Sequence, residues 1–231
     1  MNILITGCNR GLGLELVRQY AADGWRVFAT CRRPAESSAL LEIADGNPAV
    51  SVHRLDVTRA DDVRSIAWAL EGMPLDVLFN NAGVYLEEDY RRPELGAIRY
   101  DEWLRTFEVN TLGAVRLTEA LRGNLQEGGK RLVACMTSHM GSIADIDIPG
   151  SYYYRSSKAA LNAAMCGLAH ALRPLGIGVL LLHPGGVETR MGPRGGISPE
   201  QSARGLRCLV DGYRPGDSRR FLRYDGSELP W

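Results

Sequence analysis

Lysine is almost absent from this sequence: only Lys130 and Lys158 are lysines among its 27 basic residues, and the rest are arginines. A net charge is absent as well, because 27 acidic residues balance the basic ones. A balanced chain has no general attraction to nucleic acid or to an anionic membrane surface. A bias toward arginine explains most of the basic surface, but it leaves open why position 158 kept a lysine.

Long apolar runs and clustered metal ligands are also missing. No segment approaches the ~20 apolar residues that span a bilayer, and the opening MNILITG has a strand pattern that leaves no room for a signal peptide. The five cysteines and four histidines are scattered, a distribution that argues against disulfides and metal sites. We therefore expect a cytoplasmic protein with reduced thiols, no metal, and no membrane or nucleic-acid partner.

Short apolar runs alternate with amphipathic stretches along the chain. With 231 residues and no evident linker or repeat, the chain is expected to form one domain, residues 1–231, around one core. Alternating strands and helices favour parallel strands with right-handed crossovers, so the pattern predicts a Rossmann-type doubly wound α/β sheet in three layers, α/β/α. The predicted strands are 2–6, 26–30, 50–57, 75–83, 131–138 and 178–185, and the predicted helices are 11–23, 61–71, 101–126 with a break, and 152–173.

The tail, residues 192–231, is richer in glycine, proline and arginine. It contains a helical pattern over 198–212, with Ser198 as N-cap and Pro199 at the first helical position. A last strand is predicted at 219–224, and the region is expected to form part of the substrate side. Earlier in the chain, Asp61 and Asp62 are N-cap candidates for the helix predicted at 61–71.

Glycines at 7, 11 and 13 occupy the predicted turn between the first strand and the first helix. Without a Cβ, such a turn is sharp and lets backbone N–H groups approach an anion. The helix that follows offers its free N–H groups and positive dipole end to that anion. At this place in a doubly wound fold, the pattern predicts a dinucleotide pyrophosphate site, formed by Gly7, Asn9, Arg10, Gly11, Leu12 and Gly13.

The end of the second predicted strand indicates which dinucleotide binds. An acidic residue there would favour NAD(H) through the ribose hydroxyls, but the chain has Cys31, followed by Arg32 and Arg33. Guanidinium groups suit a 2′-phosphate, and Arg10 adds a cation on the same side. The alternative is that these are ordinary surface arginines. We expect NADP(H) as the cofactor.

Three consecutive tyrosines precede the second lysine in SYYYRSSK, residues 151–158. On a helix that starts near residue 152, side chains four apart share a face, so Lys158 pairs with Tyr154 and not with Tyr152 or Tyr153. A free phenol titrates near 10, and a nearby ammonium favours the phenolate. We predict that Lys158 lowers the pKa of Tyr154 toward neutrality, which makes Tyr154 a general acid/base. A compact ammonium suits this place better than a guanidinium fork.

A tyrosine acid needs a second donor to polarise the substrate oxygen. The segment CMTSHMGS ends the fifth predicted strand, and ligands bind at the carboxyl ends of strands in such sheets. Ser138 is the first candidate, Thr137 a possible substitute and Ser142 a weaker one. His139 is interpreted as part of the loop or of the pocket wall rather than as a catalytic group.

Together these features resemble the short-chain dehydrogenase/reductase family. ISPEQSA and the closing DGSELPW are similar to the branch that contains Sniffer-type carbonyl reductases and bacterial C-factor proteins. The matching segments follow the family's order and are TGCNRGLG (6–13), LDV (55–57), NNAG (80–83), VN (109–110), TSHMGS (137–142), YRSSK (154–158) and HPGGVET (183–189).

The resemblance implies NADPH-dependent reduction of an aldehyde, ketone or quinone to an alcohol by hydride transfer. Ser138 would polarise the carbonyl and Tyr154 would donate the proton. Lys158 would also hold the nicotinamide ribose, and Asn110 would anchor a water that links Lys158 to solvent. The remaining implied cofactor contacts are Asp56 and Val57 at the adenine, Asn80, Ala82 and Gly83 along the cofactor, and Pro184, Gly185, Val187 and Thr189 around the nicotinamide.

The sequence departs from the family pattern in two places. The separation between Ser138 and Tyr154 is longer than usual, and Gly186 stands where the branch usually has a bulky aromatic residue. The second departure suggests a roomier pocket and leaves the substrate unidentified. The segment 85–103 either lines the substrate entrance or is a solvated loop. The small, apolar helix after Lys158 is expected to meet another subunit in a homodimer or homotetramer.

A second hypothesis from a different class remains open. The resemblance to C-factor proteins also implies an NAD(P)-binding signalling or regulatory protein with weak or vestigial catalysis. An intact set of Ser138, Tyr154, Lys158 and Asn110 argues against lost chemistry without excluding it.

Overall fold

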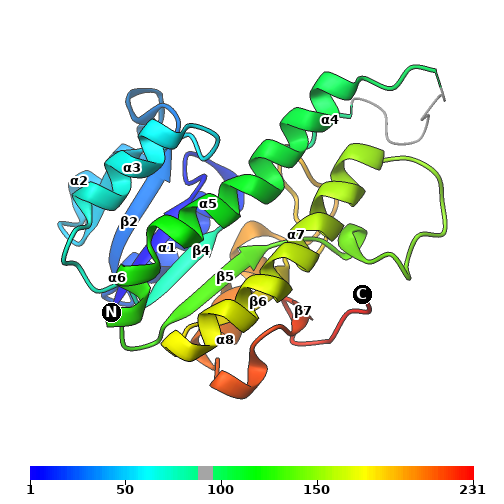
Figure 1. The fold of residues 1–231 in the computed structure, drawn as a ribbon. Coiled ribbons are helices and arrows are strands. Elements are labelled where there is room, and N and C mark those ends of the chain that lie inside the picture. The colour runs from blue at the N-terminus through cyan, green and yellow to red at the C-terminus, as the bar shows by residue number, and fades with distance from the viewer. Residues whose placement is uncertain (88–95) are drawn as a thin grey trace.

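Seven parallel strands form one sheet in the computed structural model of the protein, which describes residues 1–87 and 96–231. The strand order is β3-β2-β1-β4-β5-β6-β7, so the sheet grows outward in both directions from the β1–β4 pair (Figure 1). This order confirms the predicted doubly wound sheet. The strands are β1 (Asn2–Thr6), β2 (Arg26–Cys31), β3 (Val50–Arg54), β4 (Val77–Asn80), β5 (Leu132–Met136), β6 (Gly178–His183) and β7 (Phe221–Arg223).

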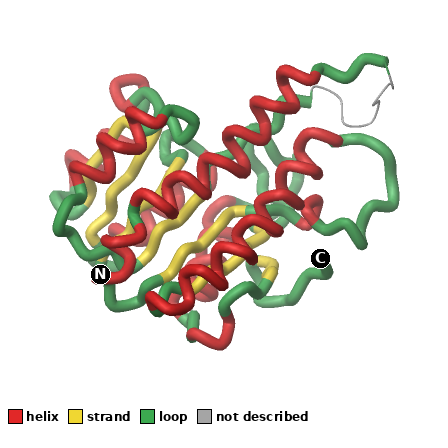
Figure 2. Tube along the Cα trace, in the orientation of Figure 1, coloured by secondary structure: helices red, strands yellow, loops and turns green. Residues whose placement is uncertain are grey.

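Helices cover both faces of the sheet (Figure 2). The core on one face joins strand residues such as Ile3 to helices α1, α2 and α8, and the core on the other face joins residues such as Leu4 to α3, α5, α6 and α7. These helices are α1 (Gly11–Ala22), α2 (Ser38–Gly46), α3 (Ala60–Ala69), α5 (Gly113–Ala120), α6 (Arg122–Glu127), α7 (Tyr152–Leu172) and α8 (Pro199–Asp211). The predicted three layers, α/β/α, are therefore present.

The central strands are apolar along their whole length because both of their faces are covered. Every residue of β4, β5 and β6 is buried. The two cores separate by alternation, since Ile3 and Ile5 belong to one and Leu4 to the other. The strand order reverses at β1 and β4, and ligands bind at the carboxyl ends of the strands at such a switch point.

The sequence did not indicate every helix. Helix α2 was not predicted. Its Leu40 side chain is buried in the core on one face of the sheet. The capping prediction for α3 was wrong: the helix begins at Ala60 after Arg59, and Asp62 is buried, where it accepts the backbone N–H of Asp56 at 2.9 Å. The prediction for α8 is confirmed, because the Ser198 hydroxyl accepts the N–H of Gln201 at 3.1 Å.

The predicted break within 101–126 is a change of helix type. Helix α4 (Tyr100–Phe107) passes into a π-helical turn, Glu108–Leu112, before α5 begins. π-Helical turns occur often at functional sites. The turn buries Asn110, one of the predicted catalytic residues.

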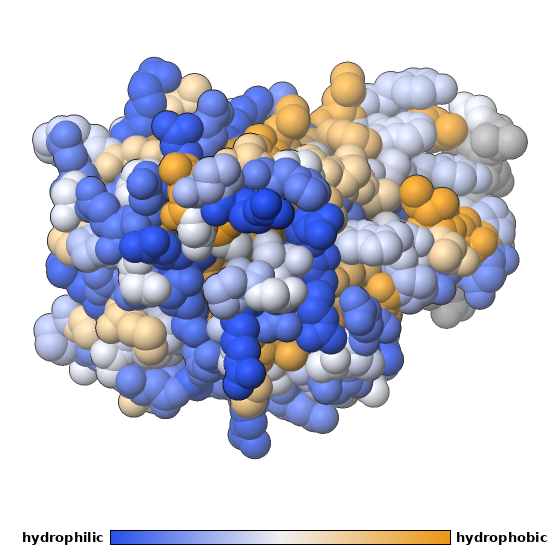
Figure 3. Space-filling model, turned by 60° about the horizontal axis from the view of Figure 1, so that its bottom comes forward, coloured by the Kyte–Doolittle hydropathy of each residue, from blue (hydrophilic) through white to orange (hydrophobic). Residues whose placement is uncertain are grey.

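The described part of the chain has no group of three or more histidine, cysteine or acidic residues that could hold a metal ion. Within the same residues, no helix has both the length and the apolar character needed to cross a membrane. The face in Figure 3 is mostly hydrophilic, and its apolar residues form separate patches.

Candidate active site

The turn after β1 has the geometry that an anion site requires. Gly7 has a φ of +74°, in the left-handed region. At Gly13 the constraint is contact: an added Cβ would lie 2.3 Å from the Gly7 carbonyl oxygen and 2.6 Å from Asn81 Nδ2. The backbone of the turn therefore packs directly against the start of α1.

Helix α1 begins without a side-chain cap. Its N-cap, Arg10, makes no capping hydrogen bond, and its first turn contains no acidic residue. The free N–H groups and the positive end of the helix dipole suit an anionic ligand. The structure also brings Thr189 to this turn, because a Cβ at Gly11 would lie 3.6 Å from Thr189 Cγ2. These residues fit a dinucleotide pyrophosphate.

Two residues that sequence reasoning missed hold the turn in place. The Thr6 hydroxyl accepts the N–H groups of Asn81 and Ala82 at 3.0 and 2.9 Å, and the Asn81 side chain donates to the Thr6 carbonyl at 2.8 Å. Thr6 lies in the segment TGCNRGLG and Asn81 in the segment NNAG. These two motifs were the sequence features that could have identified them. Asn80, predicted to bind the cofactor, is buried, and its side-chain amide donates instead to Thr118 Oγ1 at 3.4 Å.

The end of β2 carries no carboxylate. Cys31 is buried, and its sulfur contacts the Ser37 hydroxyl at 3.5 Å. Arg32 is exposed and Arg10 is exposed, whereas Arg33 pairs with Glu36 at 3.1 Å. Of the three predicted arginines, Arg10 and Arg32 therefore remain without an ion pair in the described residues.

Asp56 lies beside this basic region. Burial would raise the pKa of its carboxyl, but hydrogen bonds from Thr58 and the charges of Arg105 and Arg32 outweigh burial, and the pKa is lowered. The carboxylate accepts from the Thr58 hydroxyl at 2.7 Å and lies 3.7 Å from Arg105. Val57 is buried. The two residues predicted for the adenine thus lie at the same edge as Arg32.

Tyr154 and Lys158 share one face of α7, as the helical spacing predicts. Lys158 Nζ lies 5.6 Å from the centroid of the Tyr154 ring and donates to the Met136 carbonyl at 2.8 Å. Tyr85 packs on the other side, with ring centroids 5.1 Å apart. Lys158 is 3% exposed, which makes it a buried amine at the end of β5 rather than a surface charge.

The ionisation of this pair differs from the sequence-based expectation. Burial raises the pKa of the Tyr154 phenol to about 12, and a hydrogen bond with Ser138 opposes this only in part. Burial also lowers the pKa of Lys158 to about 8. The prediction that Lys158 brings the tyrosine pKa toward neutrality is therefore wrong for the protein alone, because the loss of hydration of the phenolate dominates. Tyr154 is a protonated acid at neutral pH.

The three candidate hydroxyls after β5 have different partners. Ser138 lowers the pKa of the Tyr154 phenol, and its oxygen accepts the Met140 N–H at 3.1 Å. Thr137 donates to Asn162 Oδ1 at 2.7 Å. Ser142 donates to the Trp231 carbonyl at 3.2 Å. Of these three hydroxyls, Ser138 is the one that acts on the pKa of Tyr154, which favours it over the two alternatives.

Asn110 connects the π-helical turn to two other segments. Its side chain accepts the Val84 N–H at 2.8 Å, and donates to the Val84 carbonyl at 2.9 Å and to the Ser157 hydroxyl at 3.0 Å. These bonds use both donors of the amide. Gly83 lies between, since an added Cβ would be 3.4 Å from Asn110 Oδ1 and 3.6 Å from Lys158 Nζ. Asn110, Gly83 and Lys158 are therefore together.

The segment after β6 borders the same edge. Gly185 has a φ of +84° and packs against Tyr224 and Ile197. Val187 is buried and forms a β-bridge with Ile197, and the Pro184 carbonyl accepts the Ser202 hydroxyl at 2.7 Å. This part of the tail fixes the predicted nicotinamide segment to α8.

The three tyrosines differ in surroundings. Tyr153 is buried, stacks on Trp103 with centroids 5.3 Å apart, and its hydroxyl accepts the Arg99 N–H at 2.6 Å. Tyr152 is half-buried. A residue that the sequence did not single out, Glu87, accepts the backbone N–H groups of Tyr153 and Tyr154 at 3.2 and 3.1 Å. Residues 88–95 of the proposed entrance segment lie outside the described residues.

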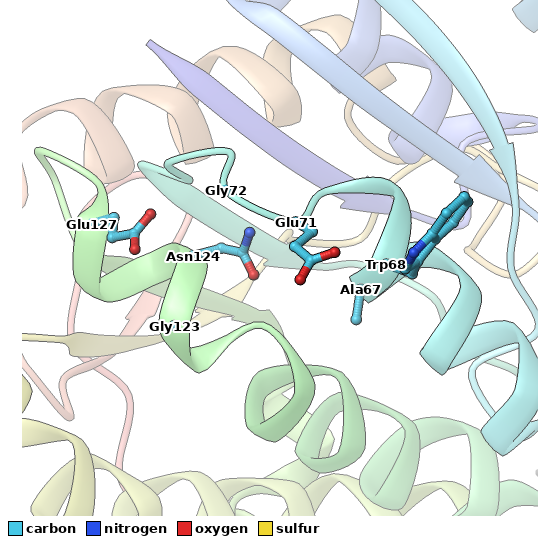
Figure 4. A pocket seen from close by; sticks show the side chains of 7 residues that line it. All are labelled: Ala67, Trp68, Glu71, Gly72, Gly123, Asn124 and Glu127. Carbon is cyan, nitrogen blue, oxygen red and sulfur yellow. The ribbon is translucent and has the colours of Figure 1, made fainter.

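A surface hollow elsewhere is separate from this arrangement. Figure 4 shows its lining residues at the end of α3 and along α6. Both segments precede β4 and β5, so the hollow lies toward the amino ends of these strands, whereas Ser138 and the glycine turn lie at the carboxyl ends. We therefore place the candidate site at the carboxyl ends of the strands and not at the hollow.

Comparison with known proteins identifies several relatives. Two relatives are C-signal of Myxococcus xanthus, 45% identical over 68% of this chain and 93% of the relative, and 1-hydroxy-2-glutathionyl-2-methyl-3-butene dehydrogenase of Rhodococcus sp. strain AD45, 37% identical over 99% of both chains. Among solved structures, carbonyl reductase Sniffer of D. melanogaster has a TM-score of 0.93 at 31% identity, covering 100% of this chain and 99% of its own.

A second solved structure is the NADPH-bound carbonyl reductase from chicken fatty liver, with a TM-score of 0.90 at 28% identity, covering 100% of this chain and 98% of its own. The model of the short chain dehydrogenase family matches residues 1–195, which include the glycine turn, Ser138, Tyr154 and Lys158. With the parallel sheet described above, these matches show that the chain is an oxidoreductase of the short-chain dehydrogenase/reductase family.

Proposed function

We propose that the protein reduces a carbonyl compound to an alcohol with NADPH, using Ser138, Tyr154, Lys158 and Asn110. The observation that carries the proposal is the place of Tyr154 on α7: Lys158 Nζ lies 5.6 Å from the centroid of its ring, burial keeps the phenol protonated, and Ser138 acts on its pKa. A protonated acid is the form that reduction needs, because the oxygen of the product alcohol must receive a proton.

NADPH is the proposed cofactor. The glycine turn and the uncapped start of α1 fit the pyrophosphate, and Arg10 and Arg32 suit a 2′-phosphate. The chicken liver neighbour is described as NADPH-bound. When bound, the cofactor supplies the hydride and the protein supplies geometry, a proton and a donor.

The roles of the protein groups follow from their contacts. Ser138 holds the substrate oxygen beside the Tyr154 hydroxyl, and Tyr154 gives that oxygen its proton. Lys158, whose pKa is lowered to about 8 by burial, is the neighbouring group that can exchange protons near neutral pH. Both N–H donors of the Asn110 side chain are used by Val84 and Ser157, so a water that it anchors would have to donate to its Oδ1 atom or contact its backbone.

The experiment is NADPH turnover of Tyr154→Phe on a panel of aldehydes, ketones and quinones. Removing the acid should lower kcat by roughly 10²–10⁴-fold while NADPH binding stays within about threefold. Tyr152→Phe is the matched control, since it removes a hydroxyl from a tyrosine two positions earlier in the same helix, and it should keep the wild-type kcat. A wild-type protein that binds NADPH but reduces nothing on the panel would contradict the proposal.

A second candidate function is favoured by the relative named C-signal. In this alternative the chain binds NAD(P) as a signalling or regulatory protein, and turnover is weak or incidental. Cellular phenotypes of Tyr154→Phe and Arg32→Asp would separate the two. A phenotype that depends on Arg32 and not on Tyr154 would indicate binding as the function, and dependence on both would indicate turnover.

Three expectations stay predictions: a homo-oligomer formed through α7, a single functional unit over residues 1–231, and a cytoplasmic location. Sedimentation of the purified protein checks the first of these.

A further inference from the structure

Arg155 follows Tyr154 on α7 and carries a charge without a partner. Its guanidinium makes no hydrogen bond or ion pair within the described residues, and its Nε atom is buried and unsatisfied. A buried polar nitrogen without an acceptor is costly, and guanidinium groups are normally satisfied by carboxylates or phosphates. Because Arg155 is next to the proposed acid Tyr154, its unsatisfied guanidinium bears on what the site binds.

Glu87 does not neutralise Arg155. The charge of Arg155 acts to lower the pKa of Glu87, but no ion pair joins the two side chains. The Glu87 carboxylate instead accepts the N–H groups of Tyr153 and Tyr154. Burial raises the pKa of Glu87, and the hydrogen bonds from these N–H groups and the charge of Arg155 oppose that rise only in part.

A second unsatisfied group lies on the same side of the site. His139 follows Ser138, and its ring contacts His183 with centroids 4.9 Å apart. His183 is 4% exposed, and its Nδ1 atom is buried without a partner. Burial lowers the pKa of His139, and the charge of Arg155 lowers it further. The charge of Arg155, which follows Tyr154, thus acts on His139, which follows Ser138 and contacts His183.

The other unsatisfied buried side-chain atoms of the described residues have a separate explanation. They are Tyr20 Oη and Arg207 Nε. Arg207 lies over the Tyr20 ring, 5.0 Å from its centroid, and pairs with Asp23. These residues belong to α1, α8 and the turn after α1, on the face of the sheet opposite α7. The remaining unsatisfied atoms are therefore concentrated at the candidate site.

We propose that Arg155 binds a carboxylate of the substrate, so that the preferred substrates are carbonyl compounds that carry a carboxylate. This inference rests on the proposed function and names its substrate class. A guanidinium donates two parallel hydrogen bonds to a planar carboxylate.

The experiment compares pairs of substrates that differ only in charge: 3- and 4-carboxybenzaldehyde and 4-oxopentanoate, each against its methyl ester. With wild-type protein and NADPH, at least one acid should exceed its ester in kcat/KM by about tenfold or more. Arg155→Gln should remove this preference, mainly through KM, and leave the ester within about threefold. Arg155→Lys should restore part of it. Arg173→Gln, at an exposed arginine after α7, is the control and should change neither.

Equal use of acid and ester by the wild type, or an equal loss for both in Arg155→Gln, would overturn the inference. A binding measurement separates this from failure of the proposed function. Calorimetry of the same acids with NADPH-loaded Tyr154→Phe requires no turnover, and adding Arg155→Gln should weaken binding about tenfold or more. Arg155-dependent binding without turnover in the wild type would reject the reductase proposal alone, whereas absence of such binding would reject the carboxylate site.

Discussion

The Glu87 carboxylate accepts the backbone N–H of Tyr154 at 3.1 Å, so a residue 67 positions earlier in the chain caps the helix that carries the proposed acid. The local N-cap, Ser151, has a φ of +52° and makes no capping hydrogen bond with its side chain. Its hydroxyl instead contacts the Tyr85 hydroxyl at 2.8 Å. Residues 84–87 therefore fasten the start of α7 to the end of β4.

We predict that Glu87→Ala lowers kcat by about tenfold, because the first turn of α7 loses its acceptor and Tyr154 is less well positioned. Unfolding in urea should show a loss of about 1 kcal/mol, the usual effect of removing a helix cap. Glu87→Gln keeps an acceptor oxygen and should recover most of the kcat. Equal damage by both variants would show that charge, and not hydrogen bonding, is what Glu87 contributes.

Gly13 offers a test of the proposed pyrophosphate site. A Cβ there would lie 2.3 Å from the Gly7 carbonyl oxygen, so Gly13→Ala must displace the turn, at a cost of about 1–3 kcal/mol. We expect NADPH to bind at least tenfold more weakly, measured by fluorescence titration.

Gly123→Ala is the control for the glycine substitution. No atom lies within 4 Å of a Cβ at Gly123, which is in α6 and is labelled in Figure 4. Alanine should leave NADPH affinity unchanged and increase stability by up to about 1 kcal/mol. Unchanged NADPH binding in Gly13→Ala would contradict the assignment of this turn.

Arg32 should determine the preference between the two nicotinamide cofactors. Loss of a charge-assisted hydrogen bond costs about 1.5–3 kcal/mol, so Arg32→Gln should weaken NADPH binding by roughly 10–100-fold and leave NADH binding nearly unchanged. Arg33→Gln should have a smaller effect because Arg33 already pairs with Glu36. Equal loss of both cofactors in Arg32→Gln would place Arg32 away from the 2′-phosphate.

The buried amine of Lys158 should make stability depend on pH. Its pKa is lowered from 10.5 to about 8, so between these values the unfolded chain binds more protons than the folded one, and stability rises with pH. The contribution from pH 8 to 9.5 is up to about 2 kcal/mol. The raised pKa of Tyr154, about 12, acts in the opposite direction but only above pH 10.

Urea unfolding of the wild type and Lys158→Met at pH 8.0 to 9.5 checks this. Lys158→Met should lack the increase in the free energy of unfolding with pH that Lys158 causes. Lys130→Met controls for loss of a lysine side chain, and because it retains Lys158 it should keep the rise. Parallel pH curves for the wild type and Lys158→Met would show that the amine is not held in an apolar environment.

The sequence by itself determined the type of fold and the face on which the proposed acid lies. Unbroken apolar runs such as VLFN and LVACM are buried central strands, and the four-residue spacing brings Tyr154 and Lys158 together. Both are properties of nearest neighbours along a strand or helix, so the local pattern suffices. The same holds for Ser198, whose capping bond spans only three residues.

Tertiary structure alone decided what depends on segments distant in sequence. The pKa of Tyr154 was predicted to fall because the helix shows only its lysine, but it rises because burial by other segments removes water from the phenol. Asp62 was predicted as a helix cap, but its carboxylate instead contacts Arg54 of β3 and accepts the N–H of Asp56 in the turn after β3. The cap from Glu87 and the unpaired charge of Arg155 arise in the same way, since loop packing and desolvation have no periodic signal in the sequence.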